Sequence, residues 1–192
     1  MATRIIRWDS LTPVGWKNGG GVAASIAMAP PTASHDDFEW WVNVATISRS
    51  GPFSHFPGVD RDFRVLDGGP VELAVAGRPR RVAVADGVAY RFPGDIATIA
   101  HLVGEPGQVL NILTRRDRCT VDVRELELTG DTTAGSAGHI MVGFVRTGSC
   151  SVRADDEWGT LGPFDTFVAD EPAQLQTDTG ARLILAEFAL AG

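Results

Sequence analysis

The amino-acid sequence predicts an all-β fold, either a sandwich or a barrel. Short runs rich in β-branched residues alternate with turns, and 22 glycines and 11 prolines separate these runs at close intervals. Apolar residues almost nowhere recur at the three- and four-residue spacing of an amphipathic helix without an intervening Gly or Pro. Strands that are short, numerous and separated by turns pack as sandwiches or barrels.

Seven runs are expected to form strands. In chain order they are 71–77, 80–86, 107–114, 119–128, 139–145, 151–154 and 182–190. The run 119–128 alternates apolar and charged residues with one change of phase near residue 125, which predicts a half-buried strand with a bulge. The run 107–114 is apolar on both faces except for Asn111, so this amide must find a partner or face a cavity.

The same strand plan occurs twice. In each half a hairpin is followed by a strand that ends at an acidic turn, at residues 93–95 and 170–172, and then by two more strands. This is the plan of a cupin lobe, so the sequence predicts a double cupin (bicupin) of two jelly-roll-like β-barrels. We expect residues 1–128 to form the N-terminal strands and the first lobe, and 129–138 a polar connector. Residues 139–192 would form a second lobe, completed by N-terminal strands, in a single compact unit.

Length and charge narrow the class of protein. A chain of 192 residues, 44% hydrophobic and 21% charged, is long enough to bury a substantial core. Its formal charge of −7 disfavours nucleic acid and anionic membranes as partners. No apolar run has the length of a membrane span or a signal peptide, so we expect a cytoplasmic protein. In that compartment Cys119 and Cys150 are interpreted as small core residues rather than a disulfide.

Neither a metal site nor a catalytic nucleophile is indicated. The four histidines are isolated, without an HxH pair or a carboxylate at a matching offset, so we expect no metal and no other cofactor. Ser54 precedes His55, but adjacent residues on an extended chain point to opposite sides, and no GxSxG motif occurs. Ser54 is therefore interpreted as a turn residue.

The segment GWKNGGG, residues 15–21, combines a tryptophan, a lysine and an amide with three consecutive glycines. It does not match a phosphate-binding loop, because Lys17 precedes the glycines. Two interpretations stay open. In one, Trp16 stacks on a ligand, Lys17 supplies charge and Asn18 forms hydrogen bonds; in the other, the segment is a bulge or a tight turn capped by Asn18.

Three arginines are candidates for binding an anion. Arg115 and Arg116 end an apolar strand, and Arg61 follows the segment GPFSHFPG. Guanidinium groups at strand ends can point into the mouth of a barrel and clamp a carboxylate through two parallel hydrogen bonds. The alternative is a salt bridge with a neighbouring aspartate on a solvated rim.

Five stretches resemble the HutD/Ves family of cupin-like proteins: GWKNGGGVAASIA, FEWWVNVATI, GPFSHFPGVDRDFRVLDGG, FPGD and VLNILTRR. The resemblance covers roughly residues 8 to 128 and implies a double barrel, an association with bacterial histidine utilisation and formylglutamate as the suggested ligand. It implies nine ligand-binding positions: Trp16, Lys17, Asn18, Gly19, Gly20, Arg61, Asn111, Arg115 and Arg116. Trp41 stands where the family commonly has an arginine, which implies a changed ligand preference.

Two hypotheses for function follow. The first is a bicupin that binds a small anionic carboxylate metabolite and modulates histidine or amino-acid catabolism without turnover. The alternative is a metal-independent cupin enzyme, a hydrolase or isomerase, with Asp95, Glu105 or His101 as acid or base. A buried acid or base with a strongly shifted pKa would favour the enzyme, and a mouth lined by Lys, Arg and Asn would favour binding. Strand edges near 140–147 or 182–190 are compatible with a homodimer.

Overall fold

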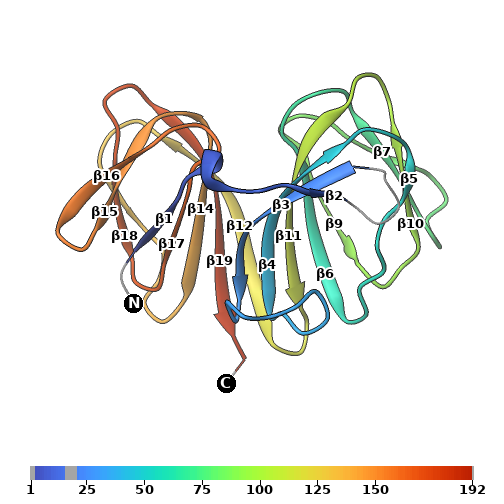
Figure 1. Ribbon diagram of the computed structural model, residues 1–192, viewed down its shortest axis with the longest axis horizontal. Coiled ribbons are helices and arrows are strands. Elements are labelled where there is room, and N and C mark those ends of the chain that lie inside the picture. Colours follow the sequence, from blue (N-terminus) through green and yellow to red (C-terminus); the bar gives the residue numbers. More distant parts are fainter. Residues whose placement is uncertain (1–2, 16–20, 192) are drawn as a thin grey trace. The chain divides into compact units, whose positions relative to one another are not determined.

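The computed structural model describes residues 3–15 and 21–191, and it confirms the all-β fold (Figure 1). Within these ranges every regular element is a strand except one 3-10 turn at Trp8–Ser10. No helix of the described residues has the length and apolar character of a membrane span. The chain divides into two compact units: unit 1 is Met1–Leu11 with Cys119–Gly192, and unit 2 is Thr12–Arg118.

Unit 2 contains two sheets whose strands all pair antiparallel. The larger sheet has the order β2-β3-β4-β11-β6-β9, with β2 (Val14–Gly15), β3 (Gly21–Ala29), β4 (Trp40–Ile47), β6 (Val59–Val65), β9 (Ala89–Pro93) and β11 (Gly107–Arg115). The smaller sheet has the order β5-β10-β7-β8, with β5 (Gly51–Pro52), β7 (Val71–Val75), β8 (Val82–Val84) and β10 (Thr98–Leu102).

The core of unit 2 draws on both of its sheets. One cluster of buried residues joins Phe63 and Val109 of the larger sheet to Leu73 of the smaller one. Side chains alternate between the two faces of a strand, so residues two positions from Phe63 and Val109 share their face. The inner face of the larger sheet therefore also carries Arg61 of β6 and Asn111 of β11.

Unit 1 has the same plan of a larger and a smaller antiparallel sheet. The larger has the order β1-β17-β14-β19-β12, with β1 (Arg4–Ile6), β12 (Cys119–Leu128), β14 (Ile140–Gly148), β17 (Thr166–Ala169) and β19 (Ala181–Leu190). The smaller has the order β13-β18-β15-β16, with β13 (Thr132–Ala134), β15 (Cys150–Ala154), β16 (Glu157–Leu161) and β18 (Ala173–Gln176).

The core of unit 1 is filled by apolar side chains, among them Leu183, Leu185 and Phe167. Phe167 of β17 lies opposite Gly143 of β14, and a Cβ atom at Gly143 would come within 2.1 Å of the Phe167 ring. Only glycine therefore leaves room for this phenyl group. Both cysteines are buried thiols rather than a disulfide, as the sequence indicated: Cys119 and Cys150.

The observed units divide the chain at a different place from the expected lobes. β12 pairs with β19 from Cys119 to Leu128, so this strand belongs to unit 1, whereas the sequence analysis ended the first lobe at residue 128. The expected connector 129–138 contains β13, which pairs with β18. At the other end of the chain, β1 pairs with β17 and adds an N-terminal strand to unit 1.

Candidate functional site

A buried arginine marks the interior of unit 2. Arg61 lies on β6, opposite Phe92 of β9, and only 8% of its surface is exposed. Its Cζ atom lies 5.0 Å from the ring centroid of Phe53, 5.3 Å from that of Phe56 and 5.8 Å from that of Phe92. The guanidinium is thus surrounded by aromatic rings, whose negative faces attract a cation.

Arg61 lacks a charged partner among the described residues. None of their acidic groups forms a salt bridge with it, and its buried Nε–H group has no hydrogen-bond acceptor there. Burial lowers the pKa of Arg61 to about 10, so the side chain is still protonated at neutral pH. A buried cation with unfilled donors is unfavourable until an anion supplies the missing hydrogen bonds.

Two amides lie on the same inner face. Asn111 of β11 is opposite Asn43 of β4, and its Nδ2 donates a hydrogen bond of 3.1 Å to Asn43 Oδ1. Both residues are buried. The sequence required a hydrogen-bond partner or a cavity for the Asn111 amide, and Asn43 is that partner. Each amide group has two donors and two acceptor lone pairs, so both can form further hydrogen bonds.

The three polar residues Asn43, Arg61 and Asn111, here called the polar band, separate two apolar clusters. Along β11, Asn111 stands between Val109 of one cluster and Leu113 of the other. Arg61 is opposite Leu113, which makes Asn111 its diagonal neighbour across the strand pair. Diagonal neighbours on one face lie about 7–8 Å apart, within the combined reach of two long polar side chains.

Trp41 forms an aromatic wall next to this band. It is buried, belongs to the same cluster as Leu113, and its ring meets that of Phe56 at a centroid distance of 6.4 Å. Its Nε1 donates to Ser25 Oγ at 2.8 Å, and the His35 ring stacks on it at 4.5 Å. At this position, where the resemblance implies an arginine, the chain therefore supplies a ring and no charge.

Arg115 is used to hold neighbouring loops. Its Nε donates to the carbonyl of Phe38 at 3.0 Å, one terminal nitrogen donates to that of Pro57 at 3.3 Å, and the other to that of Asp36 at 2.8 Å. Its Cζ lies 5.4 Å from the Phe38 ring centroid. Each of its three nitrogens thus binds a backbone carbonyl within unit 2.

Arg116 forms the salt bridges that the sequence analysis gave as the alternative. Its Nε donates to Asp60 at 2.7 Å, and its two terminal nitrogens donate to the two oxygens of Asp95 at 2.8 and 3.1 Å. The hydrogen bond from Arg116 is the main reason that the pKa of Asp95 falls to about 2, and the same bond raises the pKa of Arg116. Asp95 is therefore an ionised structural partner at neutral pH.

The structure thus brings two of the nine sequence-predicted residues together, Arg61 and Asn111, and places Arg115 and Arg116 at the end of β11 with partners inside the chain. The remaining predicted residues, Trp16 to Gly20, lie outside the described residues. Sequence reasoning did not single out Asn43 or Phe92. Asn43 carries the same signal as Asn111, a lone polar residue in an apolar strand, whereas Phe92 lies in the FPGD stretch but nothing there indicates contact with Arg61.

The described residues do not contain a cluster of three or more His, Cys, Asp or Glu side chains that could hold a metal ion. The pKa shifts of the described carboxyl groups are also informative. Every resolved shift is downward, at Asp37, Asp95, Asp165 and Glu187. A general acid at neutral pH needs a raised pKa, so these carboxyl groups do not have that property.

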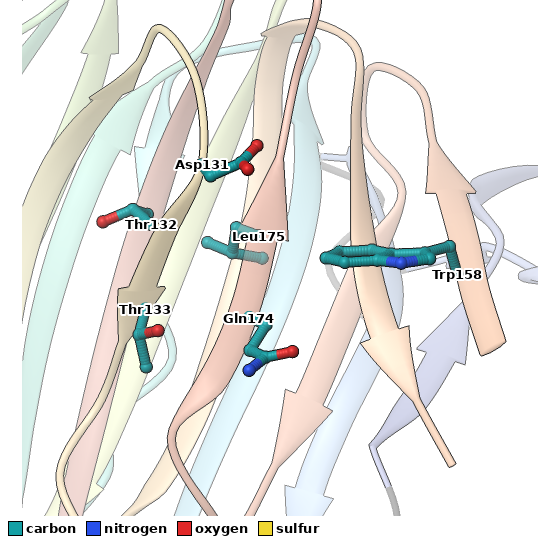
Figure 2. A pocket seen from close by; sticks show the side chains of 6 residues that line it. All are labelled: Asp131, Thr132, Thr133, Trp158, Gln174 and Leu175. Carbon is teal, nitrogen blue, oxygen red and sulfur yellow. The ribbon is translucent and has the colours of Figure 1, made fainter. Parts of the chain in front are cut away.

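A concave surface lies on the small sheet of unit 1 (Figure 2). This groove of about 340 Å³ is lined by Asp131, Thr132, Thr133, Trp158, Gln174 and Leu175. Figure 2 shows Leu175 and Gln174 of β18 between the indole of Trp158 and the two threonines. The one charged side chain that lines the groove is acidic, so its charge disfavours an anionic ligand there.

Together these features define a cupin-like, all-β protein with a buried basic group inside one unit. The model of the HutD family matches residues 9–185, and the chain belongs to that family. Protein Ves from Citrobacter koseri is 38% identical over 135 residues, which cover 70% of this chain and 68% of that protein. Protein Ves from Cronobacter sakazakii is 34% identical over 128 residues, covering 66% of this chain and 68% of that protein.

Solved structures support the fold. A conserved protein of unknown function, PA5104 from Pseudomonas aeruginosa PAO1, has a TM-score of 0.87 at 24% identity and covers 97% of this chain and 98% of its own. HutD from Pseudomonas fluorescens SBW25, in a formate condition, has a TM-score of 0.83 at 24% identity, with 100% of both chains covered. At this level of identity the likeness concerns the fold.

Proposed function

We propose that this chain binds a small carboxylate metabolite inside unit 2 and thereby modulates histidine or amino-acid catabolism without chemical turnover. The observation that carries the proposal is Arg61, a protonated guanidinium that is buried among aromatic rings and has no salt bridge to the described residues. A carboxylate is the natural counterion, because a guanidinium offers it two parallel N–H donors in a fixed geometry.

The polar band provides the rest of the recognition. The carboxylate pairs with Arg61, and the amides of Asn43 and Asn111 orient a second polar group of the ligand. Formylglutamate fits this chemistry, since it carries carboxylates and a formamide group that can pair with an asparagine amide. Lys17 with Trp16 and Asn18, beside Gly19 and Gly20, is proposed from the sequence alone as a further part of the site.

We also propose that each unit is a jelly-roll lobe, so that the chain is a double cupin. In both units a large and a small antiparallel sheet share one apolar cluster, which supports this interpretation. The alternative of a metal-independent enzyme gains no support from Asp95, one of its three acid or base candidates. Asp95 is occupied by Arg116, and the pKa shift of its carboxyl group is downward.

Calorimetric titration tests the proposal. Formate, formylglutamate, glutamate and urocanate are titrated into the wild-type protein, Arg61→Met and Lys17→Ala, with Arg153→Gln of unit 1 as the control. We expect at least one carboxylate to bind the wild type and the control alike. Arg61→Met is expected to lose about 2–5 kcal/mol of binding free energy, because a hydrogen-bonded charge pair is removed from a buried site. Equal binding by the wild type and Arg61→Met would refute the role of Arg61.

A further inference from the structure

Residues 53–58, which connect β5 to β6 and are here called the Phe loop, cover the candidate site. They supply Phe53 and Phe56, two of the three rings around the Arg61 guanidinium. The third ring, Phe92, belongs to β9 and is held by strand pairing with β6. The enclosure of Arg61 thus depends on where the Phe loop lies.

Asp95 and Gly94, in the turn after β9, hold the Phe loop through its backbone. Phe56 N donates to Gly94 O at 2.9 Å, and Gly58 N donates to Asp95 Oδ2 at 3.3 Å. His55 Nε2 lies 2.9 Å from Asp95 O. The contact is close, because a Cβ atom at Gly94 would lie 3.0 Å from Val59 O and 3.4 Å from Phe56 Cβ.

The end of β11 secures the same loop from the other side. The backbone N of Arg116 donates to Gly58 O at 2.9 Å, and the Arg115 side chain donates to Pro57 O at 3.3 Å. The Arg116 side chain then binds both oxygens of Asp95 and one oxygen of Asp60. Arg116 thus connects β11, the turn after β9 and the start of β6 at the base of the Phe loop.

We propose that Arg116 is a positioning residue that, through Asp95, fixes the Phe loop over Arg61 and so sets the affinity of the site. The inference rests on the proposed function and deepens it, since it assigns Arg116 to closure of the site rather than to contact with the ligand. The side chains of Arg116 and Asp95 are 39% and 32% exposed. Partly exposed ion pairs contribute little to global stability, so their loss is expected to act locally on the loop.

The first test measures the loop without any ligand. Arg116→Gln and Asp95→Asn are compared with the wild type by hydrogen exchange and by phenylglyoxal modification of Arg61, read by peptide mass spectrometry. The control is Arg153→Gln, which removes a surface ion pair of unit 1 in which the Arg153 side chain is 45% exposed and Asp156 is fully exposed. We expect the Phe56 amide to exchange and Arg61 to react about three- to tenfold faster in both variants, at unchanged protection of the core strands. Unchanged rates in both variants would overturn the proposal.

A variant that keeps the charges of Arg116 and Asp95 tests whether the position of the Phe loop alone controls access to Arg61. Gly94→Ala leaves the ion pairs in place but introduces a methyl group next to Phe56 and Val59 O, so it should displace the Phe loop and accelerate modification of Arg61 in the same direction. Modification at the wild-type rate in Gly94→Ala would show that the loop does not enclose Arg61.

The second test concerns affinity. If the wild type binds formylglutamate, Arg116→Gln should weaken that binding about three- to tenfold, and equal affinity would refute the effect of Arg116 on the site. If the wild type binds none of the carboxylates, the proposed function fails, while the exchange and modification rates still decide whether Arg116 holds the loop.

Discussion

The two units share one strand plan and differ in what lies on the inner face of the larger sheet. In unit 1 the inner strand β19 places Leu183 and Leu185 in the core, whereas in unit 2 the inner strand β11 places Val109 and Asn111 there. In each unit these strands lie between two others of the larger sheet. The shared strand plan therefore does not determine the polarity of the inner face; a few inward-pointing positions do.

One antiparallel strand pair in each larger sheet shows the same contrast. Phe92 of β9 lies opposite Arg61, and Phe167 of β17 lies opposite Gly143. One phenyl ring flanks a guanidinium, and the other occupies the space that a missing side chain leaves. The same residue type at the same kind of strand pair thus encloses a polar group in one unit and fills the core in the other.

The largest expected effect comes from removing the Phe167 ring from the core of unit 1. Phe167→Ala should lower the free energy of unfolding by about 3–5 kcal/mol, because a fully buried ring is lost and Gly143 cannot fill the space. Urea denaturation measures the loss. A loss below about 1 kcal/mol would show that unit 1 does not depend on this ring.

Replacing Arg61, the buried charge of unit 2, should change the free energy of unfolding in the opposite direction. Arg61→Met is expected to raise the free energy of unfolding by about 1–4 kcal/mol, because a similarly long apolar side chain removes the penalty of a buried charge. The same variant should bind carboxylates more weakly, by the loss of binding free energy given above. Denaturation and calorimetry on the same protein measure both effects, and a destabilised variant would indicate that the aromatic rings compensate the charge.

The amide pair provides a smaller and more specific comparison. Asn111→Leu should lower the free energy of unfolding by about 1–3 kcal/mol, because it leaves buried Asn43 without its hydrogen-bond donor. The double variant Asn43→Leu with Asn111→Leu makes these two facing positions apolar, as in the core of unit 1. Its stability should return to within about 1 kcal/mol of the wild type. A double-mutant cycle measures the coupling, and additive losses would exclude a direct interaction.

The pH dependence of binding should be flat until alkaline pH. Burial lowers the pKa of Arg61 from its ordinary value to about 10 in the folded protein, so the side chain carries its charge through neutrality and loses it above about pH 10. Carboxylate binding should therefore be constant between pH 6 and 9, by the ordinary pKa values of carboxyl groups, and fall above about pH 10.

Linkage gives stability the opposite trend in that range. Above about pH 10 the unfolded chain still keeps the proton that folded Arg61 loses, so this group's contribution to stability rises with pH there.

Calorimetric titrations of the wild type and Lys17→Ala across this pH range show which cation causes the loss of affinity. A fall in carboxylate affinity that disappears in Lys17→Ala would belong to the lysine.

The all-β class, seven of the strands and the buried amide of Asn111 could be predicted from the sequence, because each leaves a local signal. Asn111 interrupts an apolar run, and this anomaly correctly indicated a buried amide. The partners of Arg115 were not predictable, because backbone carbonyls have no sequence signature. Phe92 reaches Arg61 only through the register of β6 and β9, which no local pattern specifies.

The change of phase in β12 was misinterpreted. A bulge was expected near residue 125, but β12 pairs with β19 without a shift of register from Cys119 to Leu128. Val121 and Val123 lie on one face of the strand, and Leu126 and Leu128 on the other. A change of buried face and a bulge give the same pattern in one strand, and only the partner strand distinguishes them.

The contact between Gly143 and Phe167 has a practical consequence for unit 1. Trimming that ring would leave a dry hollow bordered by hydrocarbon, and hollows of this kind take up xenon or benzene. Unit 1 would then contain an apolar cavity that binds xenon or benzene. If Arg61 acts as proposed, unit 2 would bind a metabolite anion, and each site could be altered by mutations in its own unit.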